Sequence, residues 1–552
     1  MKKTTYKEKR FSDFREIIRY AAERFGSGTA FLKKESGKSI RITYRELKNR
    51  FYALCSVFLK QGFAGKRIGI VGRNCPEWVL SYLCAATVGV AVPLDKELSP
   101  EDIRSFANDA ECVAICAESR YLEKLAPTLS PSVSCISFDE INSLSEEHIR
   151  QDTETEIDRL PIPRDQMQIL IFTSGTTGNS KGVCLSQYNI CSNIYSTVQV
   201  VKIRRNDRTL SVLPLHHTYE CTLDCLLLLS RGACITFCEG LTHLKRNISE
   251  YRPTVLVVVP LLLKALHKQI KRGIVKSCPT RYREIFENES LASALQKVPF
   301  PIRFAIRKKV LQSLGGALRL FIVGAADVDV SLVEDFSALG IRTLQGYGLT
   351  ECSPLLAGNS DFFLNPQSTG RAVPGVELRI DRPNEDGIGE ILAKGDNIML
   401  GYYRDPVATA GAFLNGWFRT GDLGSFGSDG ALYIRGRCKN VIVTENGKNI
   451  YPEELETRLS EYPEIGEVFV LAQTVDGSVC VKAKILPNLE YLQEKLGHIP
   501  LMEEIQKAIQ KVVKDLNEKI PGYKNIRVFE VLTKALEKTT TQKVKRFGTN
   551  AV

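Results

Sequence analysis

A turn rich in glycine and hydroxyl side chains follows an apolar strand in the first third of the chain. The strand reads ILIF (169–172) and the turn reads TSGTTGNSKG (173–182). Glycines let a backbone fold closely around an anion and present its N–H groups, and hydroxyls and a lysine add further donors. The turn is not a Walker loop, because Lys181 is followed by glycine and not by Ser or Thr. The sequence therefore predicts a phosphate-binding loop of another class.

Alternating strand and helix patterns must position this loop. Residues 39–43 predict a strand that leads into a helix, which Thr43 and Glu46 open as a capping box. A second helix is predicted at 75–89. Apolar runs predict further strands at 66–72, 112–119, 210–215, 233–238, 255–260 and 318–324. This alternation of strands and helices predicts an α/β fold with doubly wound, mainly parallel sheets.

The pattern changes after residue 355. Short strands separated by turns are expected at 375–381, 389–395 and 430–436. A smaller α/β unit then has predicted helices at 452–462 and 503–520 and predicted strands at 467–473, 479–486 and 526–532. We therefore expect a large multi-subdomain N-terminal body (1–435) that includes a β-rich subdomain, and a small, mobile α/β C-terminal domain (436–552).

The composition is that of a folded globular chain, with 43% hydrophobic and 25% charged residues. No run of the sequence reaches the roughly 18 apolar residues of a membrane-spanning helix. The start, MKKTTYKEKRFSDF, is basic and lacks the apolar core of a secretory signal. These features predict a cytoplasmic protein.

Positive charge is concentrated at 264–309, where 12 Lys and Arg residues stand against three Glu. Such a segment suits a solvated helical face, peripheral contact with the anionic inner face of a membrane, or an acidic carrier protein. We expect no nucleic-acid partner, because aromatic side chains do not alternate with the basic ones as they do on a stacking platform.

Four cysteines with C-x3-C spacing raise the alternative of a zinc site. They are Cys221, Cys225, Cys234 and Cys238. Their surroundings, TLDCLLLLSRGACITF (222–237), are strongly apolar, and a free cysteine commonly behaves as a small buried hydrophobe. We expect these cysteines to pack in the core.

Five further motifs follow the loop in order. They read YGLTECSP (347–354), GEILAKGDNIMLGYY (389–403), GWFRTGDLG (416–424), GRCKNVIVTENGKNIYPEELE (436–456) and LEKTTTQKVKR (536–546). With the loop, they resemble the signatures of the adenylate-forming superfamily, which includes acyl-CoA synthetases, adenylation domains and beetle luciferases. The resemblance covers most of the chain. It implies that a carboxylate reacts with ATP to form an acyl-adenylate and pyrophosphate, after which a thiol displaces AMP.

The resemblance also implies roles for residues around the nucleotide. Glu351 would hold Mg²⁺, the hard cation suited to carboxylate and phosphate oxygens, and Thr350 would touch the α-phosphate. Asp422 would accept hydrogen bonds from the ribose hydroxyls, and Arg437 would lie near the ribose and phosphate. The residues expected to contact the β- and γ-phosphates or the adenine are Thr173, Ser174, Gly175, Thr176, Thr177, Gly178, Lys181, Gly324, Ala325, Ala326, Tyr347 and Gly348.

The last motif resembles the segment that carries the family's catalytic lysine. Lys543 would bridge the carboxylate and the α-phosphate in the first half-reaction. The segment departs from the common pattern at Glu537, where many members have proline, and at Gln542, where many have glycine. Similar versions without glycine occur in long-chain fatty acid ligases.

The motif at 436–456 resembles the start of the family's mobile domain. Lys439 stands at the hinge position about which that domain rotates between the two half-reactions. The loop with Gly447 and Lys448 would then help to form the thioester site. Such a rotation lets one active site catalyse two reactions.

PLHHTYE (214–220) resembles the family's motif at the acyl pocket. His217 would lie against the substrate carboxylate and gate the path of the thiol, and His216 would be structural. Members that select amino acids usually carry an aspartate just after this position, whereas Thr218 and Tyr219 follow here. This argues against an amino acid. We expect a medium-to-long-chain fatty acid as the substrate, because the run 221–229 is apolar and the basic stretch 264–309 resembles an insert of long-chain acyl-CoA synthetases.

Free CoA is the expected thiol, because the chain ends nine residues past Lys543 and no carrier domain is fused. The expected cofactor set is thus ATP, Mg²⁺ and CoA. A separate, acidic acyl carrier protein is the alternative acceptor. Alternatives of other classes are a luciferase-like oxygenase, which no residue demands, and a non-catalytic adenylate-binding protein. The presence of Lys543, Thr350 and Glu351 argues against the last.

Overall fold

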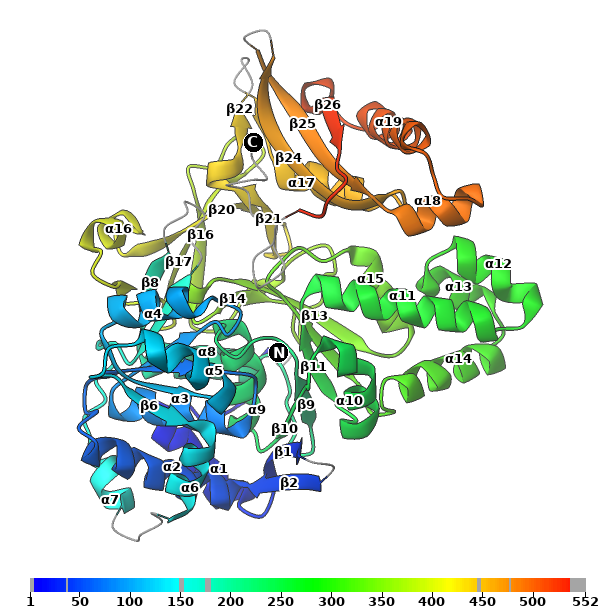
Figure 1. Cartoon of the computed structure of the whole chain (residues 1–552). Coiled ribbons are helices and arrows are strands. Elements are labelled where there is room, and N and C mark those ends of the chain that lie inside the picture. The colour runs from blue at the N-terminus through cyan, green and yellow to red at the C-terminus, as the bar shows by residue number, and fades with distance from the viewer. Residues whose placement is uncertain are drawn as a thin grey trace. The chain divides into compact units, whose positions relative to one another are not determined.

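The computed structural model describes residues 4–35, 38–147, 153–173, 180–443, 448–475 and 478–536. The described chain divides into two compact units (Figure 1). The first comprises the residues up to 173, 180–377 and 393–418, and the second comprises 378–392 and the residues from 419 onward. The predicted boundary between residues 435 and 436 stays a prediction, because it is defined by the residue about which the C-terminal domain would rotate. Among the described residues, no helix is both long and apolar enough to cross a membrane.

A seven-stranded sheet in the first unit carries the flanks of the predicted phosphate loop. Its order is β18-β8-β7-β4-β3-β5-β6. The bounds are β3 (Arg67–Val71), β4 (Val90–Leu94), β5 (Cys112–Ala117), β6 (Ser134–Ser137), β7 (Ile169–Thr173), β8 (Lys181–Leu185) and β18 (Gly401–Tyr402). The strands from β7 to β6 in this order pair in parallel, and β8 and β18 are antiparallel. The sheet is mainly parallel, as predicted.

A nine-stranded sheet forms the other half of this unit, in the order β15-β14-β13-β12-β11-β9-β10-β1-β2. The bounds are β1 (Thr29–Glu35), β2 (Lys38–Thr43), β9 (Arg208–Ser211), β10 (Cys234–Phe237), β11 (Val255–Val258), β12 (Leu320–Val323), β13 (Arg342–Gly348), β14 (Leu355–Gly358) and β15 (Arg371–Ala372). The strands from β13 to β1 are parallel, and the antiparallel strands lie at the two edges.

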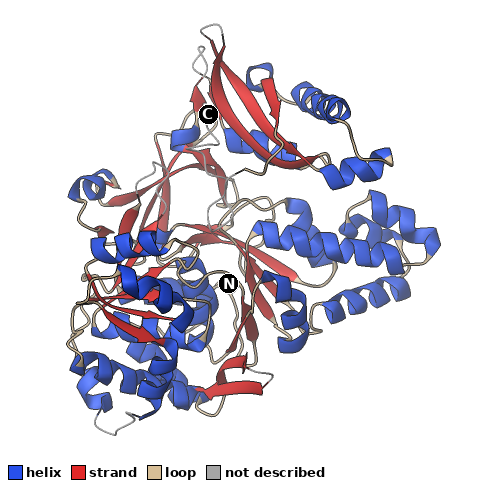
Figure 2. Cartoon of the chain, in the orientation of Figure 1, coloured by secondary structure: helices blue, strands red, loops and turns tan. Residues whose placement is uncertain are grey.

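Helices connect the strands of both sheets (Figure 2). They are α1 (Phe14–Phe25), α2 (Tyr44–Lys60), α3 (Pro76–Val88), α4 (Pro100–Asp109), α5 (Ser119–Leu125), α6 (Phe138–Glu147), α7 (Thr153–Asp158), α8 (Gln187–Val198), α9 (Leu227–Ser230), α10 (Leu244–Tyr251), α15 (Val330–Ala338) and α16 (Pro406–Gly411). The predicted capping box at α2 is confirmed, since the Thr43 hydroxyl accepts from the Glu46 N–H and the Glu46 carboxylate accepts from the Thr43 N–H.

One helical segment differs from ordinary helix geometry. Residues Tyr219–Leu226 form a π-helix, η2, that continues into α9. Short 3-10 turns elsewhere are η1 (Ala126–Thr128), η3 (Leu241–His243), η4 (Thr350–Cys352), η5 (Cys438–Asn440) and η6 (Gly522–Lys524). Single π-turns recur at functional sites, and η2 directly follows the PLHH segment.

The basic segment forms a helical group at one end of the first unit. Its helices are α11 (Pro260–Ser277), α12 (Thr280–Asn288), α13 (Leu291–Lys297) and α14 (Phe300–Ser313), which lie side by side in Figure 1. They share a core with α15, to which Leu263, Phe286, Leu295 and Ile306 contribute. The His267 Nε2 and Asp335 Oδ2 atoms, 2.7 Å apart, join α11 to α15.

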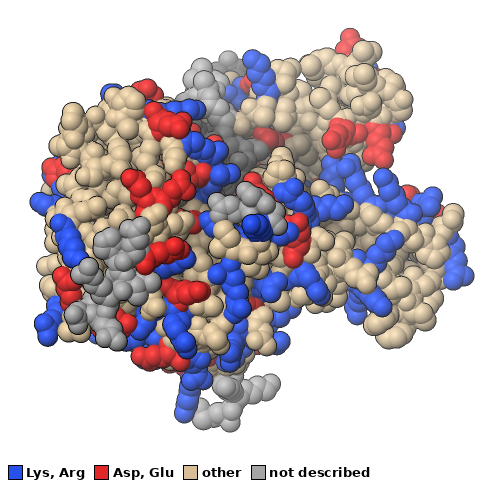
Figure 3. All heavy atoms as spheres, turned by 60° about the horizontal axis from the view of Figure 1, so that its bottom comes forward, with Lys and Arg blue, Asp and Glu red and all other residues tan. Residues whose placement is uncertain are grey.

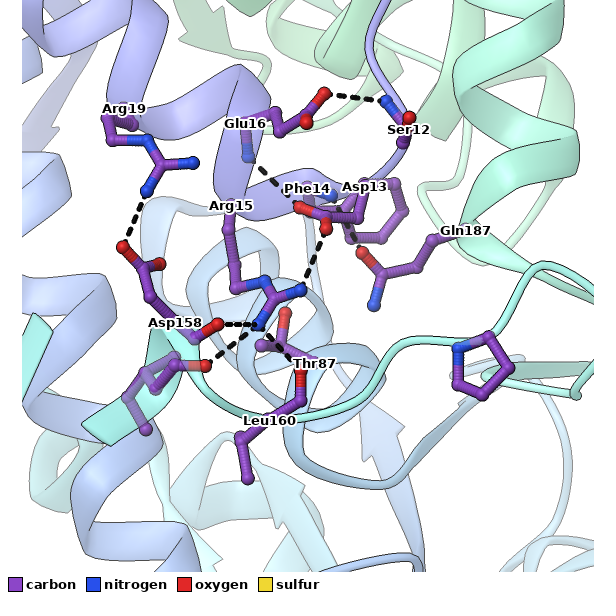
Figure 4. A network of polar contacts seen from close by, with 12 residues as sticks. Ser12, Asp13, Phe14, Arg15, Glu16, Arg19, Thr87, Asp158, Leu160 and Gln187 are labelled. Atoms are coloured by element: carbon purple, nitrogen blue, oxygen red, sulfur yellow. Dashed lines mark hydrogen bonds and ion pairs between the residues drawn. The ribbon is translucent and has the colours of Figure 1, made fainter. Parts of the chain in front are cut away.

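A buried arginine ties α1 to the chain that precedes β7 (Figure 4). The Arg15 guanidinium donates to the carbonyls of Ile157, Asp158 and Leu160 and pairs with Asp13 at 2.8 Å. Gln187, which begins α8 just after β8, accepts from the Phe14 N–H at 2.7 Å. These bonds anchor both sides of the β7–β8 pair.

A five-stranded sheet forms the β-rich part, with the order β16-β17-β20-β19 and β21 beside β20. Its bounds are β16 (Val376–Asp381), β17 (Gly389–Gly395), β19 (Phe413–Leu414), β20 (Trp417–Phe426) and β21 (Leu432–Arg437). The part of the second unit that follows this sheet holds β22 (Ile442–Val443), β23 (Asn449–Ile450), α17 (Pro452–Ser460), β24 (Ile465–Val475), β25 (Ser478–Pro487), α18 (Leu489–Leu496), α19 (Met502–Glu518) and β26 (Ile526–Val531). The elements predicted here are confirmed, and α17 and α19 pack on the β24-β25-β26 sheet through one apolar core.

Candidate active site

The predicted phosphate loop is flanked by two residues that face each other. Thr173 ends β7 and Lys181 begins β8, and these residues are direct partners in the antiparallel pair. The Thr173 hydroxyl lies 3.4 Å from the Lys181 carbonyl oxygen, to which it donates. The other predicted phosphate contacts, Ser174, Gly175, Thr176, Thr177 and Gly178, lie outside the described residues.

A tyrosine joins this lysine to the predicted metal ligand. The Lys181 Nζ lies 4.5 Å from the centre of the Tyr402 ring, and the Tyr402 hydroxyl donates to Glu351 Oε1 at 3.1 Å. Burial and then the charge of Glu351 raise the pKa of Tyr402, so the phenol stays a neutral donor. The structure thus brings a cation and a carboxylate to one place. The tyrosine pair at the end of GYY (401–403) was the available signal for Tyr402, and the sequence reasoning missed it.

The predicted nucleotide contacts at 324–326 and 347–351 lie where parallel strands end. β12 and β13 are neighbours, so residues 324–326 and 347–351, which follow or end these strands, lie at the same sheet edge. A Cβ atom at Gly348 would lie 1.8 Å from the Pro354 carbonyl oxygen, so only glycine fits there. Ala325 has a φ of 72°, a conformation rare for a residue with a side chain. At the ends of β12 and β13 the backbone is therefore tightly packed at Gly348 and in a rare conformation at Ala325.

His217 lies in the turn that leads into η2. Its N–H donates to the Pro214 carbonyl at 3.1 Å, and its carbonyl accepts from the Cys221 N–H at 3.0 Å. The ring centres of His217 and His216 are 4.0 Å apart. Burial and then Lys96 lower the pKa of His216 to about 3. His216 is therefore neutral although Asp95 lies 3.7 Å away, in keeping with a structural role.

Asp422 and Arg437 face each other on β20 and β21 of the second unit. They are direct strand partners, and the Arg437 Nε donates to Asp422 Oδ1 at 2.7 Å. The Asp422 carboxylate is buried, with 5% of the residue exposed. Lys439 is exposed in η5, and Lys448 is exposed just before β23. Gly447 and Lys543 lie outside the described residues.

The cysteine set occupies the core rather than a metal centre. Cys221, Cys225 and Cys234 are buried and Cys238 is half-buried. Burial raises the pKa of the Cys234 thiol to about 11, as expected for a cysteine that packs in the core. Within the described residues, no group of three or more His, Cys, Asp or Glu side chains is arranged to hold a metal ion.

Comparison with known proteins adds independent evidence. A family model described as AMP-binding enzyme matches residues 18–403. The chain is 27% identical over 543 residues to long-chain-fatty-acid–CoA ligase FadD15 of Mycobacterium bovis, covering 92% of this chain and 90% of the relative. It is 28% identical over 530 residues to long-chain-fatty-acid–CoA ligase 1 of Homo sapiens, covering 86% of this chain and 74% of the relative.

Solved structures share the fold. The anthranilate CoA ligase AuaEII in complex with anthranoyl-AMP superposes with a TM-score of 0.75 at 20% identity, covering 98% of this chain and 96% of that one. A fatty acyl CoA synthetase of Mycobacterium tuberculosis gives a TM-score of 0.65 at 22% identity, covering 97% and 96%.

The fold, the motifs at the ends of β12 and β13, and the relatives together define an adenylate-forming enzyme. Its class is that of the AMP-forming acid–thiol ligases. The chain belongs to the AMP-binding enzyme family. The resemblance drawn from the six motifs and the predicted fold class are thereby confirmed.

Proposed function

We propose that this protein is an ATP-dependent fatty acid–CoA ligase that forms a fatty acyl-adenylate and then a fatty acyl-CoA. The observation that carries the proposal is the Lys181–Tyr402–Glu351 group beside a phosphate-type turn. A cation and a carboxylate at one place are what a triphosphate and its metal require. The names of the two sequence relatives support the substrate pair, since both are long-chain-fatty-acid–CoA ligases.

The residues fit the nucleotide and its metal. Glu351 supplies a half-buried carboxylate of the type that Mg²⁺ prefers, and Mg²⁺ would supply neutralisation of phosphate charge. Lys181 adds a positive charge for the phosphates, and Thr350 lies next to Glu351 for a contact with the α-phosphate. Asp422 holds a buried acceptor for the ribose hydroxyls, and Arg437 orients its carboxylate.

In the first half-reaction, a carboxylate oxygen of the fatty acid attacks the α-phosphorus, and pyrophosphate leaves. Two anions must meet, so positive charge at the reacting atoms lowers the barrier. Lys543 takes this role, between the carboxylate and the α-phosphate. Gly324, Ala325, Ala326, Tyr347 and Gly348 line the adenine side, and the phosphate side comprises Thr173 and residues 174–178.

In the second half-reaction, the CoA sulfur attacks the acyl carbon and AMP leaves. The adenylate is already activated, so His217 need not act as a base and orients the acyl group. We propose that Lys439 is the hinge of the C-terminal domain (436–552) and that Gly447 and Lys448 complete the thioester site. Because the domain must rotate between steps, changes here affect the second step more than the first.

The variants Lys448→Ala and Lys439→Pro test this hinge. Each is expected to slow thioester formation about tenfold more than adenylation, because proline fixes φ at the hinge and the alanine removes a contact of the second state only. Single-turnover assays of acyl-AMP and acyl-CoA measure both rates. Lys507→Ala, an exposed lysine on α19 of the same unit, is the control. A larger loss in adenylation than in thioester formation would refute the domain-rotation account.

A medium-to-long acyl chain is supported by the apolar character of the segment behind His217. η2 and α9 are buried throughout 220–230. A pyrophosphate-release assay over fatty acids of two to eighteen carbons, run with CoA, with holo acyl carrier protein and with neither, tests substrate and acceptor together. Release that depends on chain length and on CoA supports the proposal. Turnover with carrier protein alone would make the enzyme an acyl carrier protein loader.

The basic helices suit peripheral contact with an anionic membrane, the source of long-chain fatty acids. Lys264, Lys268, Arg272 and Lys276 are all exposed and repeat every fourth residue along α11. Figure 3 shows Lys and Arg spread over this end of the unit. On α14, Phe300 and Phe304 are 73% and 59% exposed with ring centres 6.3 Å apart. Exposed aromatic rings on a helix that also carries the exposed lysines Lys308 and Lys309 favour a lipid interface over a purely acidic protein partner.

Replacing both Phe300 and Phe304 with serine is expected to lower the affinity for vesicles of three parts phosphatidylcholine and one part phosphatidylglycerol. The loss should be about tenfold or more, because two apolar rings no longer enter the interface. Co-sedimentation measures the affinity, and higher salt should weaken wild-type binding. Phe426→Ser, at a ring that is 42% exposed in the second unit, is the control. Unchanged vesicle binding would exclude α14 as the contact.

A further inference from the structure

Two acidic side chains lie in an otherwise apolar segment next to the acyl-pocket motif. Glu220 and Asp224 both have 0% exposure and lie four residues apart on η2. Neither is explained by the chemistry above. Buried carboxylates are costly unless each oxygen finds a donor, so the pair must be accounted for by its contacts.

One oxygen of each carboxyl group is bound to β9. The Ser211 hydroxyl donates to Glu220 Oε1 at 2.6 Å, and the Thr209 hydroxyl donates to Asp224 Oδ1 at 2.5 Å. Thr209 and Ser211 lie two residues apart and therefore on one face of the strand. The π-helix is thus fastened to the sheet at two points by hydroxyl–carboxyl bonds.

The second oxygens, Glu220 Oε2 and Asp224 Oδ2, have no donor of their own among the described residues. Two carboxyl groups can bond to each other only when one of them carries a proton. Burial, and then the nearby Asp224, raise the pKa of Glu220 well above its usual range. The two side chains lie within hydrogen-bonding reach of each other. A single proton held between them would give both second oxygens a partner and would leave one net negative charge.

The titratable groups around Glu220 and Asp224 carry no positive charge that would favour loss of the shared proton. The groups that interact with the two acids are phenols and thiols whose pKa is raised by burial, so they are neutral. They are Tyr219, Cys221 and Cys225 on η2 and Cys238 after β10. The packed elements β11 and α9 contain no titratable residue. Arg208 precedes Thr209 on β9 and therefore points to the opposite face of the sheet.

The same network reaches the residues before and after His217. Asn74 donates to the Ser211 hydroxyl at 2.8 Å and to the Leu213 carbonyl at 2.6 Å. It also accepts from the Leu215 N–H at 3.2 Å. On the other side, the Tyr219 hydroxyl donates to the Val258 and Ile322 carbonyls.

Tyr219 connects η2 to the residues at 324–326, which are predicted to contact the nucleotide. A Cβ atom at Gly324 would lie 3.2 Å from the Tyr219 ring, so the ring packs directly on the first residue of the 324–326 edge. Any shift of η2 on β9 therefore displaces Tyr219 together with the turn that bears His217.

We propose that Glu220 and Asp224 are positioning residues that share one proton, and that this proton locks η2 on β9 and so sets His217 and Tyr219 against the acyl-adenylate. The inference rests on the proposed function for the place of the acyl group. It makes no use of either carboxyl group in the chemistry itself.

The variants Glu220→Gln and Glu220→Ala distinguish a role of the shared proton from a role of side-chain packing alone. Glutamine keeps the shape, accepts from Ser211 and donates to Asp224 as the protonated acid does, so near wild-type activity is expected at pH 7. Alanine leaves Asp224 buried without its partner and frees η2, so both half-reactions should slow by about 100-fold. Thr343→Val, on β13, is the control, because the buried Thr343 hydroxyl has no hydrogen-bond partner in the described structure.

The pH dependence of Tm provides a second test, because a role in packing alone would not make Tm depend on the ionisation of Glu220. Since the pKa of Glu220 is raised in the folded state, stability is present at low pH and is lost as the pH rises and removes the shared proton. The Tm of the wild type should therefore fall more steeply than that of Glu220→Gln as the pH is raised above 4.5, the ordinary pKa of glutamate, because the amide of the variant cannot lose a proton. This comparison holds even if Glu220→Ala does not fold.

Two results would overturn the inference: equal pH dependence of the wild type and Glu220→Gln, or equal impairment of Glu220→Gln and Glu220→Ala. Failure of the proposed function would look different. In that case the wild type itself would form neither acyl-AMP nor acyl-CoA from any fatty acid, while the Tm comparison would still report on the shared proton.

Discussion

Replacement of Lys543 by alanine is expected to lower the rate of acyl-adenylate formation by about 1,000-fold, whereas thioester formation from a supplied acyl-adenylate continues. The reason is that the lysine charge acts where a carboxylate and the α-phosphate are brought together, and this repulsion is absent once the adenylate exists. Rapid-quench measurement of acyl-AMP and of acyl-CoA gives the two rates separately.

The matched control for this variant is Lys534→Ala, an exposed lysine nine residues earlier in the chain. It should leave both rates unchanged. An equal loss of both half-reactions in Lys543→Ala would contradict the role given to this lysine. It would instead point to a general loss of the C-terminal segment.

Glu351→Gln is expected to reduce adenylation by about 100-fold at low Mg²⁺. The amide keeps an oxygen near Tyr402 but lacks the negative charge that attracts a hard cation. Raising the Mg²⁺ concentration should restore part of the rate, and a titration of rate against Mg²⁺ measures the shift.

Tyr402→Phe separates the hydrogen bond from the charge. It removes the donor to Glu351 Oε1 but leaves the carboxylate and the ring beside Lys181. We expect a smaller loss than for Glu351→Gln, with little change in the Mg²⁺ dependence. If Glu351→Gln shows wild-type Mg²⁺ dependence, another residue holds the metal.

Local signals were sufficient for much of the fold. The capping box of α2 depends on residues three apart in sequence, and the Thr43–Glu46 pattern predicted it correctly. Strands such as β3 and β11 are short apolar runs that are buried on both faces, so composition alone reveals them. The family resemblance rested on ordered motifs and needed no contact between distant segments, whereas the roles that it assigns to single residues stay predictions.

Contacts between distant segments were not predictable in the same way. Tyr402 meets Lys181 and Glu351 because β18 pairs with β8, more than 200 residues earlier in the chain. No pattern of periodicity carries that pairing. The Glu220–Asp224 pair is similar, since its meaning depends on two hydroxyls of β9 that the π-helix happens to face. In the sequence these acids only interrupt an apolar run.

Transfer of an isotopic label tests the central claim, that the carboxylate is activated as an adenylate, most directly. The fatty acid that supports the fastest pyrophosphate release is supplied with ¹⁸O in its carboxylate, together with ATP, Mg²⁺ and CoA, and the nucleotide product is analysed by mass spectrometry. Attack of the carboxylate on the α-phosphorus, followed by thiol attack on the acyl carbon, leaves one labelled oxygen in AMP. Unlabelled AMP, or ADP with labelled phosphate, would contradict the account.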